Sequence, residues 1–221
     1  MKLLVLDIEG TLFESGVKLK GTDYVSTIWQ GIASFLGDDA IKAEIATHKK
    51  WKEGKYKNYI EWMRDTILIH QKYGLNESQF KSLIGSAQYN KGVEKTLESI
   101  DRDKYEIVLI SGGFKELGRR VQEQFNIKHS FCACEYYFDS NGKLDAFNLM
   151  PCDFVGKLNF INIMTQAYGL NQSDWIFVGD GTNDVPIARE ANMSIGYNPS
   201  DDLAKITTYN LTEFCEILNY L

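Results

Sequence analysis

The amino-acid sequence predicts an α/β fold, a three-layer Rossmann-like core with a parallel central sheet and a helical cap inserted after the first strand. Three short apolar runs, residues 3–6, 107–110 and 175–178, have the length and composition of buried parallel strands. The segments between the later runs have helical length and charged faces. The long segment 16–85 contains no convincing buried strand. Alternating strands and helices of this kind are typical of a doubly wound sheet.

The insertion follows directly after the first strand. Ile60, Met63 and Ile67 fall on one face of a predicted helix over residues 56–73, which is the pattern of a helix packed on one side. We therefore expect a core of residues 1–15 and 87–221 and a helical cap of residues 16–86.

The remaining elements of the core follow in chain order. Helices are predicted over residues 92–103, 114–125 and 157–168. Residues 131–150 indicate a β-hairpin with a turn at Asn141-Gly142. A last helix over residues 212–221 either closes the core or joins a dimer, and the sequence indicates no oligomeric state.

Composition excludes several classes. The 221 residues are 44% apolar and 24% charged with 3 Pro, so the chain is neither collagen-like nor disordered. A net charge of −6 gives no drive toward nucleic acid or anionic lipid. The basic and aromatic stretch 49–57 has the composition of a single-strand nucleic-acid binder, but a turn in the cap is the favoured interpretation. We expect no nucleic-acid partner.

The expected compartment is the cytoplasm. Asp7 and Glu9 interrupt the apolar N-terminus, and no 18-residue apolar stretch occurs, so neither a secretory signal nor a membrane segment is predicted. The four cysteines are then reduced thiols. Cys132 and Cys134 have no second Cys or His pair at zinc-finger spacing, which argues against a structural zinc site.

Polar, glycine-bearing segments follow each of the three strands. The segments are Asp7-Ile8-Glu9-Gly10-Thr11, Ser111-Gly112-Gly113 and Gly179-Asp180-Gly181-Thr182-Asn183-Asp184. In a parallel sheet, ligands bind beyond the carboxyl ends of the strands, so these segments are expected to form one site.

The carboxylates of this site suit phosphoryl transfer. Asp7 is placed to attack phosphorus and form an acyl phosphate. Its attack on a dianion needs a cation, and Asp180 and Asp184 are the expected Mg²⁺ ligands with Asp7. Glu9 can protonate the leaving oxygen and later deprotonate water, and its carbonyl can reach the metal.

Donors for the phosphoryl oxygens are also present. We expect the Ser111 hydroxyl, the amides of Gly112 and Gly113, the Lys157 ammonium and the Thr11 hydroxyl to bind them. Each of these residues alone has a structural explanation as a cap, a loop residue or a solvated lysine. Their joint occurrence at strand ends and helix starts favours the functional interpretation.

These motifs resemble those of the haloacid dehalogenase (HAD) superfamily. With Ser111-Gly112-Gly113-Phe114 and Gly-Asp-Gly-x-Asn-Asp, the chain is most similar to the phosphoserine phosphatase-like branch, and the helical insertion resembles its C1 cap. The resemblance implies Asp7 as nucleophile, Asp180 as direct Mg²⁺ ligand beside Asp7 and the Glu9 carbonyl, and Asp184 holding a metal-bound water. It also implies that Ser111, Gly112 and Lys157 bind the phosphoryl group and that Asn183 positions the substrate or Lys157.

Two departures concern substrate and proton transfer. Glu9 stands where the family usually has Asp, so the carboxylate must be repositioned. Gly16 stands where phosphoserine phosphatases have a Glu for the substrate amino group; Glu14 lies nearby. Arg64 lies near where the family places an arginine for the substrate carboxylate, or else it pairs with Glu61 or Asp65 on the surface.

The sequence therefore predicts Mg²⁺-dependent hydrolysis of a small phosphorylated metabolite through phospho-Asp7, with phosphoserine as the leading substrate. Two alternatives stay open. A phosphotransferase would use Glu9 to activate an alcohol acceptor in place of water. A non-catalytic phosphate-binding or partner-binding protein would keep the fold without turnover.

Overall fold

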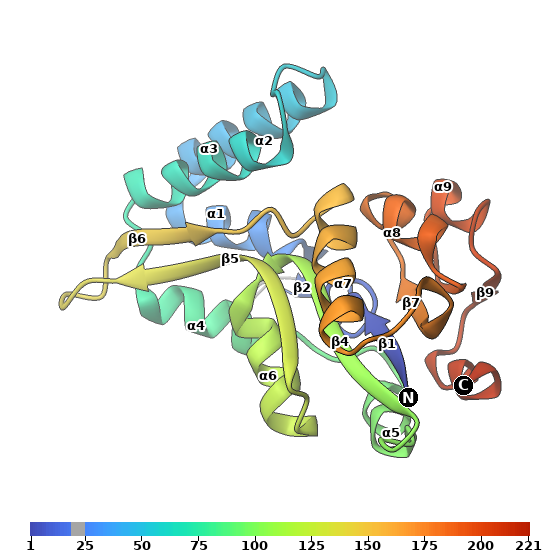
Figure 1. The fold of residues 1–221 in the computed structure, drawn as a ribbon. Coiled ribbons are helices and arrows are strands. Elements are labelled where there is room, and N and C mark those ends of the chain that lie inside the picture. The colour runs from blue at the N-terminus through green and yellow to red at the C-terminus, as the bar shows by residue number, and fades with distance from the viewer. Residues whose placement is uncertain (19–24) are drawn as a thin grey trace. The chain divides into compact units, whose positions relative to one another are not determined.

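The computed structural model describes residues 1–18 and 25–221 (Figure 1). Its contacts divide the chain into two compact units. Unit 1 comprises Met1–Glu14, Tyr89–Ala133 and Cys152–Leu221, and unit 2 comprises Ser15–Gln88 and Cys134–Pro151.

A mostly parallel sheet has the strand order β6-β5-β4-β1-β7-β8-β9, and its strands β4, β1, β7, β8 and β9 lie in unit 1. Strand β1 (Lys2–Leu6) lies between β4 (Tyr105–Phe114) and β7 (Trp175–Gly179), parallel to both. The apolar residues of these three strands are buried. Burial on both faces is typical of a parallel sheet that is covered by helices. Together with the helices that flank the sheet in Figure 1, this confirms the α/β prediction.

Two further strands continue the sheet in parallel beyond β7. They are β8 (Met193–Tyr197) and β9 (Tyr209–Leu211). Sequence analysis did not predict either strand. Strand β8 contains Ser194 and Gly196 between its apolar residues, and β9 has only three residues, so neither shows a continuous apolar run.

The helices of unit 1 connect these strands. The α-helices are α5 (Val93–Ser99), α6 (Lys115–Phe125), α7 (Val155–Ala167), α8 (Val185–Glu190) and α9 (Asp201–Ala204), and the 3₁₀ helices are η1 (Gln172–Asp174), η2 (Thr182–Asp184) and η3 (Phe214–Tyr220). The helix predicted over residues 212–221 is present as the 3₁₀ helix η3. In η3, the buried residues Phe214 and Ile217 are three apart, which a helix of three residues per turn places on one side.

Unit 2 is mainly helical. Its helices are α1 (Ile28–Leu36), α2 (Asp38–Lys52), α3 (Tyr59–Lys72) and α4 (Glu77–Ser86), and the two-residue strands β2 (Val17–Lys18) and β3 (Val25–Ser26) pair with each other. Thr27, Asn58 and Asn76 begin α1, α3 and α4, each accepting a backbone amide of the first turn. These caps satisfy donors that the helix leaves unpaired, so the chain itself sets where the helices start.

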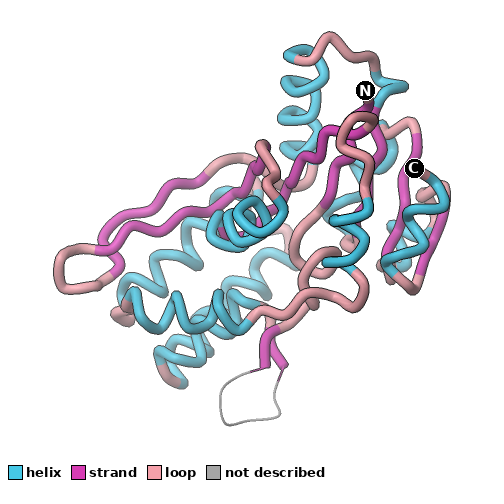
Figure 2. Tube along the Cα trace, turned by 90° about the horizontal axis from the view of Figure 1, so that it is seen from below, coloured by secondary structure: helices cyan, strands magenta, loops and turns pink. Residues whose placement is uncertain are grey.

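Figure 2 shows the hairpin of β5 (His129–Phe138) and β6 (Leu144–Leu149). It differs from the predicted hairpin in the unit to which most of it belongs and in the length of its turn. Its residues 134–151 group with unit 2, although the sequence placed them with the core. Tyr136 explains this, since its hydroxyl lies 2.7 Å from His70 Nδ1. The turn is also longer than predicted: the Asp139 carboxylate accepts the amides of Asn141 and Lys143 in a loop of residues 139–143.

Asn90 holds the loop that follows β1. Its side-chain amide donates to the carbonyls of Gly10, Thr11 and Phe13, each at 3.0 Å, and its backbone amide donates to Leu12. One side chain thereby satisfies several carbonyls of a turn that has little regular structure of its own. Asn90 therefore fixes the conformation of the loop that follows Asp7.

Candidate functional site

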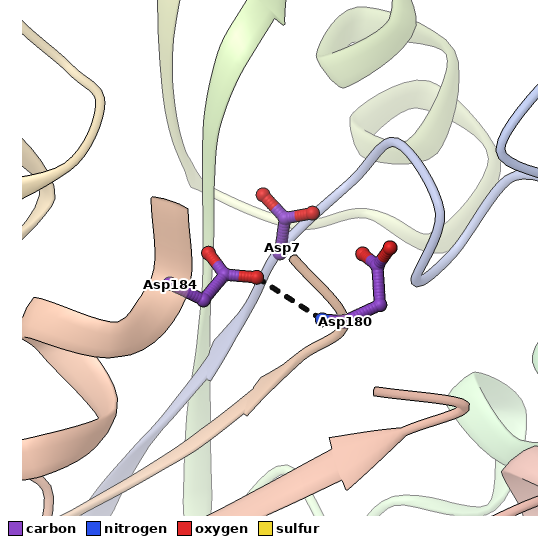
Figure 3. A group of neighbouring side chains, drawn as sticks. All are labelled: Asp7, Asp180 and Asp184. Atoms are coloured by element: carbon purple, nitrogen blue, oxygen red, sulfur yellow. Dashed lines mark hydrogen bonds between the residues drawn. The ribbon is translucent and has the colours of Figure 1, made fainter. Parts of the chain in front are cut away.

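Three carboxylates from the carboxyl ends of β1 and β7 lie together, as Figure 3 shows. Asp7 directly follows β1, Asp180 directly follows β7, and Asp184 ends η2. One oxygen of each lies within 4.8 Å of the others. Asp7 is 4% exposed, Asp184 is fully buried and Asp180 is partly exposed, so two of the three carboxylates are desolvated.

Lys157 is the cation at this cluster. It lies on α7, has no exposed surface, and its Nζ donates to Asp7 Oδ1 at 2.5 Å and to Asp184 Oδ1 at 2.6 Å. Burial alone would lower the Lys157 pKa, but Asp184 and Asp7 outweigh burial and hold that pKa well above its usual range. The lysine is charged at all physiological pH values.

The loop after β7 is held by Asp184 and by Thr11. Asp184 Oδ2 accepts the backbone amides of Asp180 and Gly181, both at 3.0 Å; the bond to Asp180 is the dashed line in Figure 3. The Thr11 hydroxyl, expected to donate to phosphate, donates to Asp180 Oδ1 at 2.9 Å. Gly10 has φ +86° and a Cβ there would lie 2.2 Å from Asp180 Oδ2, so glycine is required for this approach.

The cluster fits a hard divalent cation. Burial, together with repulsion from Asp184 and Asp180, raises the pKa of Asp7 despite the neighbouring Lys157. Burial and repulsion from Asp184 raise the pKa of Asp180 to about 7. A cation would relieve this repulsion, and a set made only of carboxylate oxygens suits Mg²⁺, Mn²⁺ or Ca²⁺.

Glu9 has the protonation behaviour of an acid/base group near neutral pH. Burial is the main cause that raises its pKa to about 7, and Asp153 and Asp180 add to the rise, while the Phe114 amide opposes it. Its Oε1 atom is buried without a hydrogen-bond partner among the described residues. A Cβ on Gly113 would lie 2.0 Å from that oxygen, so glycine at this position makes room for the longer side chain.

The Ser111-Gly112-Gly113 segment lies within β4, which continues to Phe114 before α6 begins at Lys115. Ser111 is 3% exposed, and its Oγ accepts the Gly113 amide at 3.0 Å. The prediction of a helix-start nest with both glycine amides directed at an anion is therefore wrong for Gly113. The Ser111 hydroxyl proton is left to donate to a ligand.

Asn183 and Arg64 were the other predicted substrate contacts. Asn183 Nδ2 donates to Asp153 Oδ1 at 2.7 Å, so its amide is tied to a residue of unit 1. Arg64 lies in unit 2, is 55% exposed in its side chain, and its Nη2 is 3.5 Å from Asp65 Oδ1. That neighbour is one of the two surface partners considered for it. The substrate-binding roles of Asn183 and Arg64, and of the exposed Glu14, stay predictions.

Asp153 also lies at the site, although it was not among the residues predicted from the motifs. This carboxylate is 8% exposed, and its Oδ1 lies 4.0 Å from Lys157 Nζ. The available signal was an acidic residue four positions before a functional lysine at a helix start, a spacing that brings the two side chains together.

Cys132, Cys134 and Cys152 are buried and Cys215 is exposed, and none of the four forms a disulfide among the described residues. Among the helices that the structure describes, none has the length and apolar character to cross a membrane.

The sequence matches one family model and several curated proteins. Residues 1–192 match the model of haloacid dehalogenase-like hydrolases. The phosphoserine phosphatase of Saccharomyces cerevisiae is 24% identical over 99% of this chain and 68% of its own length, and that of Lactococcus lactis is 24% identical over 95% and 89%. A probable phosphoserine phosphatase of Schizosaccharomyces pombe is 22% identical, and the chain spans 61% of its length.

Solved structures share the fold. A phospho-aspartyl intermediate analogue of phosphoserine phosphatase superposes with a TM-score of 0.78 at 20% identity, covering 100% of this chain and 98% of that one. A phosphoserine phosphohydrolase-like protein from Francisella tularensis gives a TM-score of 0.70 at 17% identity, covering 100% of both chains.

Proposed function

The chain belongs to the haloacid dehalogenase-like hydrolase family, and on that premise we propose that it is a Mg²⁺-dependent phosphatase that hydrolyses a small phosphomonoester through a phospho-Asp7 intermediate. The observation that carries the proposal is the Lys157 ammonium bound between Asp7 and Asp184, beside a third carboxylate and a carboxyl group with a pKa of about 7. Phosphoserine is the first substrate to test, because the curated relatives are named phosphoserine phosphatases.

In the first step, a carboxylate oxygen of Asp7 attacks phosphorus. The new O–P bond forms as the bond to the substrate alkoxide breaks, and the Glu9 carboxylic acid gives its proton to the leaving oxygen. A pKa of about 7 leaves a large share of Glu9 protonated at neutral pH, which this role requires. The products are an alcohol and phospho-Asp7.

In the second step, the Glu9 carboxylate takes a proton from water, and the resulting oxygen attacks phosphorus. The acyl-phosphate bond breaks, Asp7 is regenerated, and inorganic phosphate leaves. Lys157 and the Ser111 hydroxyl stabilise charge on the phosphoryl oxygens in both steps. Ser111 is already fixed for this by its bond from Gly113.

The acidic cluster is the proposed metal site. Asp7, Asp180, Asp184 and the Glu9 carbonyl would hold Mg²⁺. When bound, the ion supplies positive charge that reduces repulsion between Asp7 and a dianionic phosphate. The charge of Lys157 and the hydrogen bonds of Asp184 keep the cluster organised on the protein side.

The test is phosphate release from a panel of small phosphomonoesters that includes phosphoserine, in Mg²⁺ or in EDTA. We expect metal-dependent release that falls by about 10⁴-fold or more in Asp7→Asn. Asp202→Asn is the matched control, because Asp202 forms an exposed ion pair with Lys205 in the same unit. Equal release from Asp7→Asn and wild type would contradict the mechanism, and transfer of phosphate to an added alcohol would identify a phosphotransferase.

A further inference from the structure

Asp153 contacts two residues of the site and has no role in the steps above. Its Oδ1 accepts the Asn183 side-chain amide at 2.7 Å and lies 4.0 Å from Lys157 Nζ. That second distance is too long for a hydrogen bond. Asp153 therefore acts on Lys157 through its charge and through the chain that joins them, and on Asn183 by direct contact.

The backbone holds this carboxylate in place from two sides. A Cβ on Gly112 would lie 2.4 Å from Asp153 Oδ2, so the carboxylate packs against the glycine of β4. Phe154, the next residue, has φ +49° and ψ −127°. This conformation is rare and costly for an aromatic residue, and such strain persists where the surroundings over-determine it.

The bond between Asp153 and Asn183 joins two segments far apart in sequence. Asn183 directly precedes Asp184 in η2, and Asp153 lies four residues before Lys157 at the start of α7. The Gly156 amide donates to the Asp153 carbonyl and the Lys157 amide donates to the Phe154 carbonyl. The first turn of α7, which carries Lys157, is therefore hydrogen-bonded to Asp153 and its neighbour. Displacing Asp153 would shift Lys157 relative to both Asp7 and Asp184.

We propose that Asp153 is a positioning residue, which through Asn183 ties the start of α7 to η2 and so keeps Lys157 directed at Asp7 and Asp184. The proposal rests on the proposed phosphatase function for its kinetic consequence, but the contact and its effect on Lys157 exist without turnover. Displacements of about 1 Å at a reacting centre cost on the order of 100-fold in rate.

The kinetic test is a double-mutant cycle with Asp153→Ala and Asn183→Ala. Each variant is expected to lower kcat for the best phosphomonoester by about 10-fold to 100-fold, and the double variant by no more than the larger single effect. Asp153→Asn keeps an oxygen that can accept the Asn183 amide, so its kcat is expected well above that of Asp153→Ala. KM is not expected to rise in either Asp153 variant, because each removes a negative charge near Lys157. Asp202→Ala is the control.

A second readout is independent of turnover. The ¹H–¹⁵N signal of the Lys157 ammonium, assigned by its loss in Lys157→Met, reports the hydrogen bonds of that group. We expect similar shifts in Asp153→Ala and Asn183→Ala, and a return toward the wild-type position in Asp153→Asn.

The outcomes separate the two proposals. Wild type without turnover contradicts the phosphatase, while the Lys157 signal still decides the role of Asp153. An unchanged Lys157 signal in Asp153→Ala, independent single effects that multiply in the double variant, or Asp153→Asn as slow as Asp153→Ala would each overturn the positioning role.

Discussion

The two units bury ionisable side chains in opposite ways. In unit 1 the carboxylates of Asp7 and Asp184 are bonded directly to the buried ammonium of Lys157. In unit 2 burial alone raises the pKa of Glu44 to about 7 and lowers that of His70 to about 3. Glu44 Oε2 and His70 Nε2 have no hydrogen-bond partner among the residues described.

The buried ionisable groups are charged in unit 1 and neutral in unit 2, and this difference follows from the cost of burying charge. Removing charges from water costs several kcal/mol per ion, so a cluster of charges is kept only where opposite charges and hydrogen bonds compensate it. Glu44 and His70 avoid that cost by being neutral near pH 6. Unit 1 thus keeps buried charges together at the acidic cluster, while unit 2 buries Glu44 and His70 in their neutral forms.

Among the changes that test this comparison, the largest expected effect comes from removing the buried ammonium of Lys157. Lys157→Met leaves Asp7 and Asp184 buried without their partner, which costs about 3–5 kcal/mol of stability. Turnover is expected to fall by about 1000-fold, because a fixed donor to the phosphoryl group is lost. Phosphate release and urea unfolding measure the two effects. Lys205→Met, from an exposed ion pair, should change neither, and turnover of Lys157→Met at the wild-type rate would contradict the site.

The second prediction concerns Glu44, the buried carboxylic acid of unit 2. From about pH 4.5 to about 7 the folded protein keeps a proton on Glu44 that the unfolded chain releases. The free energy of unfolding therefore falls as pH rises through this window, by about 3 kcal/mol at most. Glu44→Gln is neutral throughout and lacks this fall. Urea unfolding at pH 5, 6, 7 and 8 gives the difference between variant and wild type, and parallel curves would show that Glu44 is charged or solvated.

A smaller effect concerns the space that Glu9 occupies. Gly113→Ala places a methyl group where Glu9 Oε1 lies, so the acid/base group must move. We expect kcat to fall by about 100-fold with a smaller change in KM, as for other misplacements of a reacting group. Glu9→Asp shortens the side chain and should restore part of the loss in the Gly113→Ala background. If Gly113→Ala has wild-type kcat, Glu9 does not act from this position.

The smallest effect is a stabilisation in unit 2. Gly85 lies in α4 and has open space where a Cβ would be. Gly85→Ala should raise the free energy of unfolding by about 0.5–1 kcal/mol by restricting the unfolded chain. Thermal unfolding measures this, and unchanged phosphate release is expected. Destabilisation would mean that Gly85 is not in regular helix.

Much of the acidic cluster could be predicted from the sequence because it depends on strand ends. Once residues 3–6 and 175–178 are identified as parallel strands, Asp7 and Asp180 must lie at the same edge of the sheet. Lys157 was found by its place at a helix start. The hydrogen bonds among these residues could not be predicted. Thr11 donates to Asp180 and the Gly113 amide donates to Ser111, whereas both groups were expected to bind phosphate.

Other features depend on contacts between distant segments. Asp153 reaches the site only because α7 starts beside η2, and Asn90, which fixes the loop after β1, comes some 80 residues later in the chain. Residues 134–151 of the β5–β6 hairpin belong to unit 2, where Tyr136 contacts His70, although the sequence pattern indicated only a β-hairpin of the core. Local propensity carries no information on such partners.

The sequence by itself determined the α/β class, the three central parallel strands and the residues that bear charge at the ends of β1 and β7. Apolar runs and the order of segments along the chain can be read from the sequence directly, and a parallel sheet brings the carboxyl ends of its strands to one edge. Only the tertiary structure decided which groups are protonated near neutral pH, which donors are already bonded and which glycines make room for a carboxylate. Those properties depend on burial and on the nearest charges, and both arise only when segments far apart in the chain pack together.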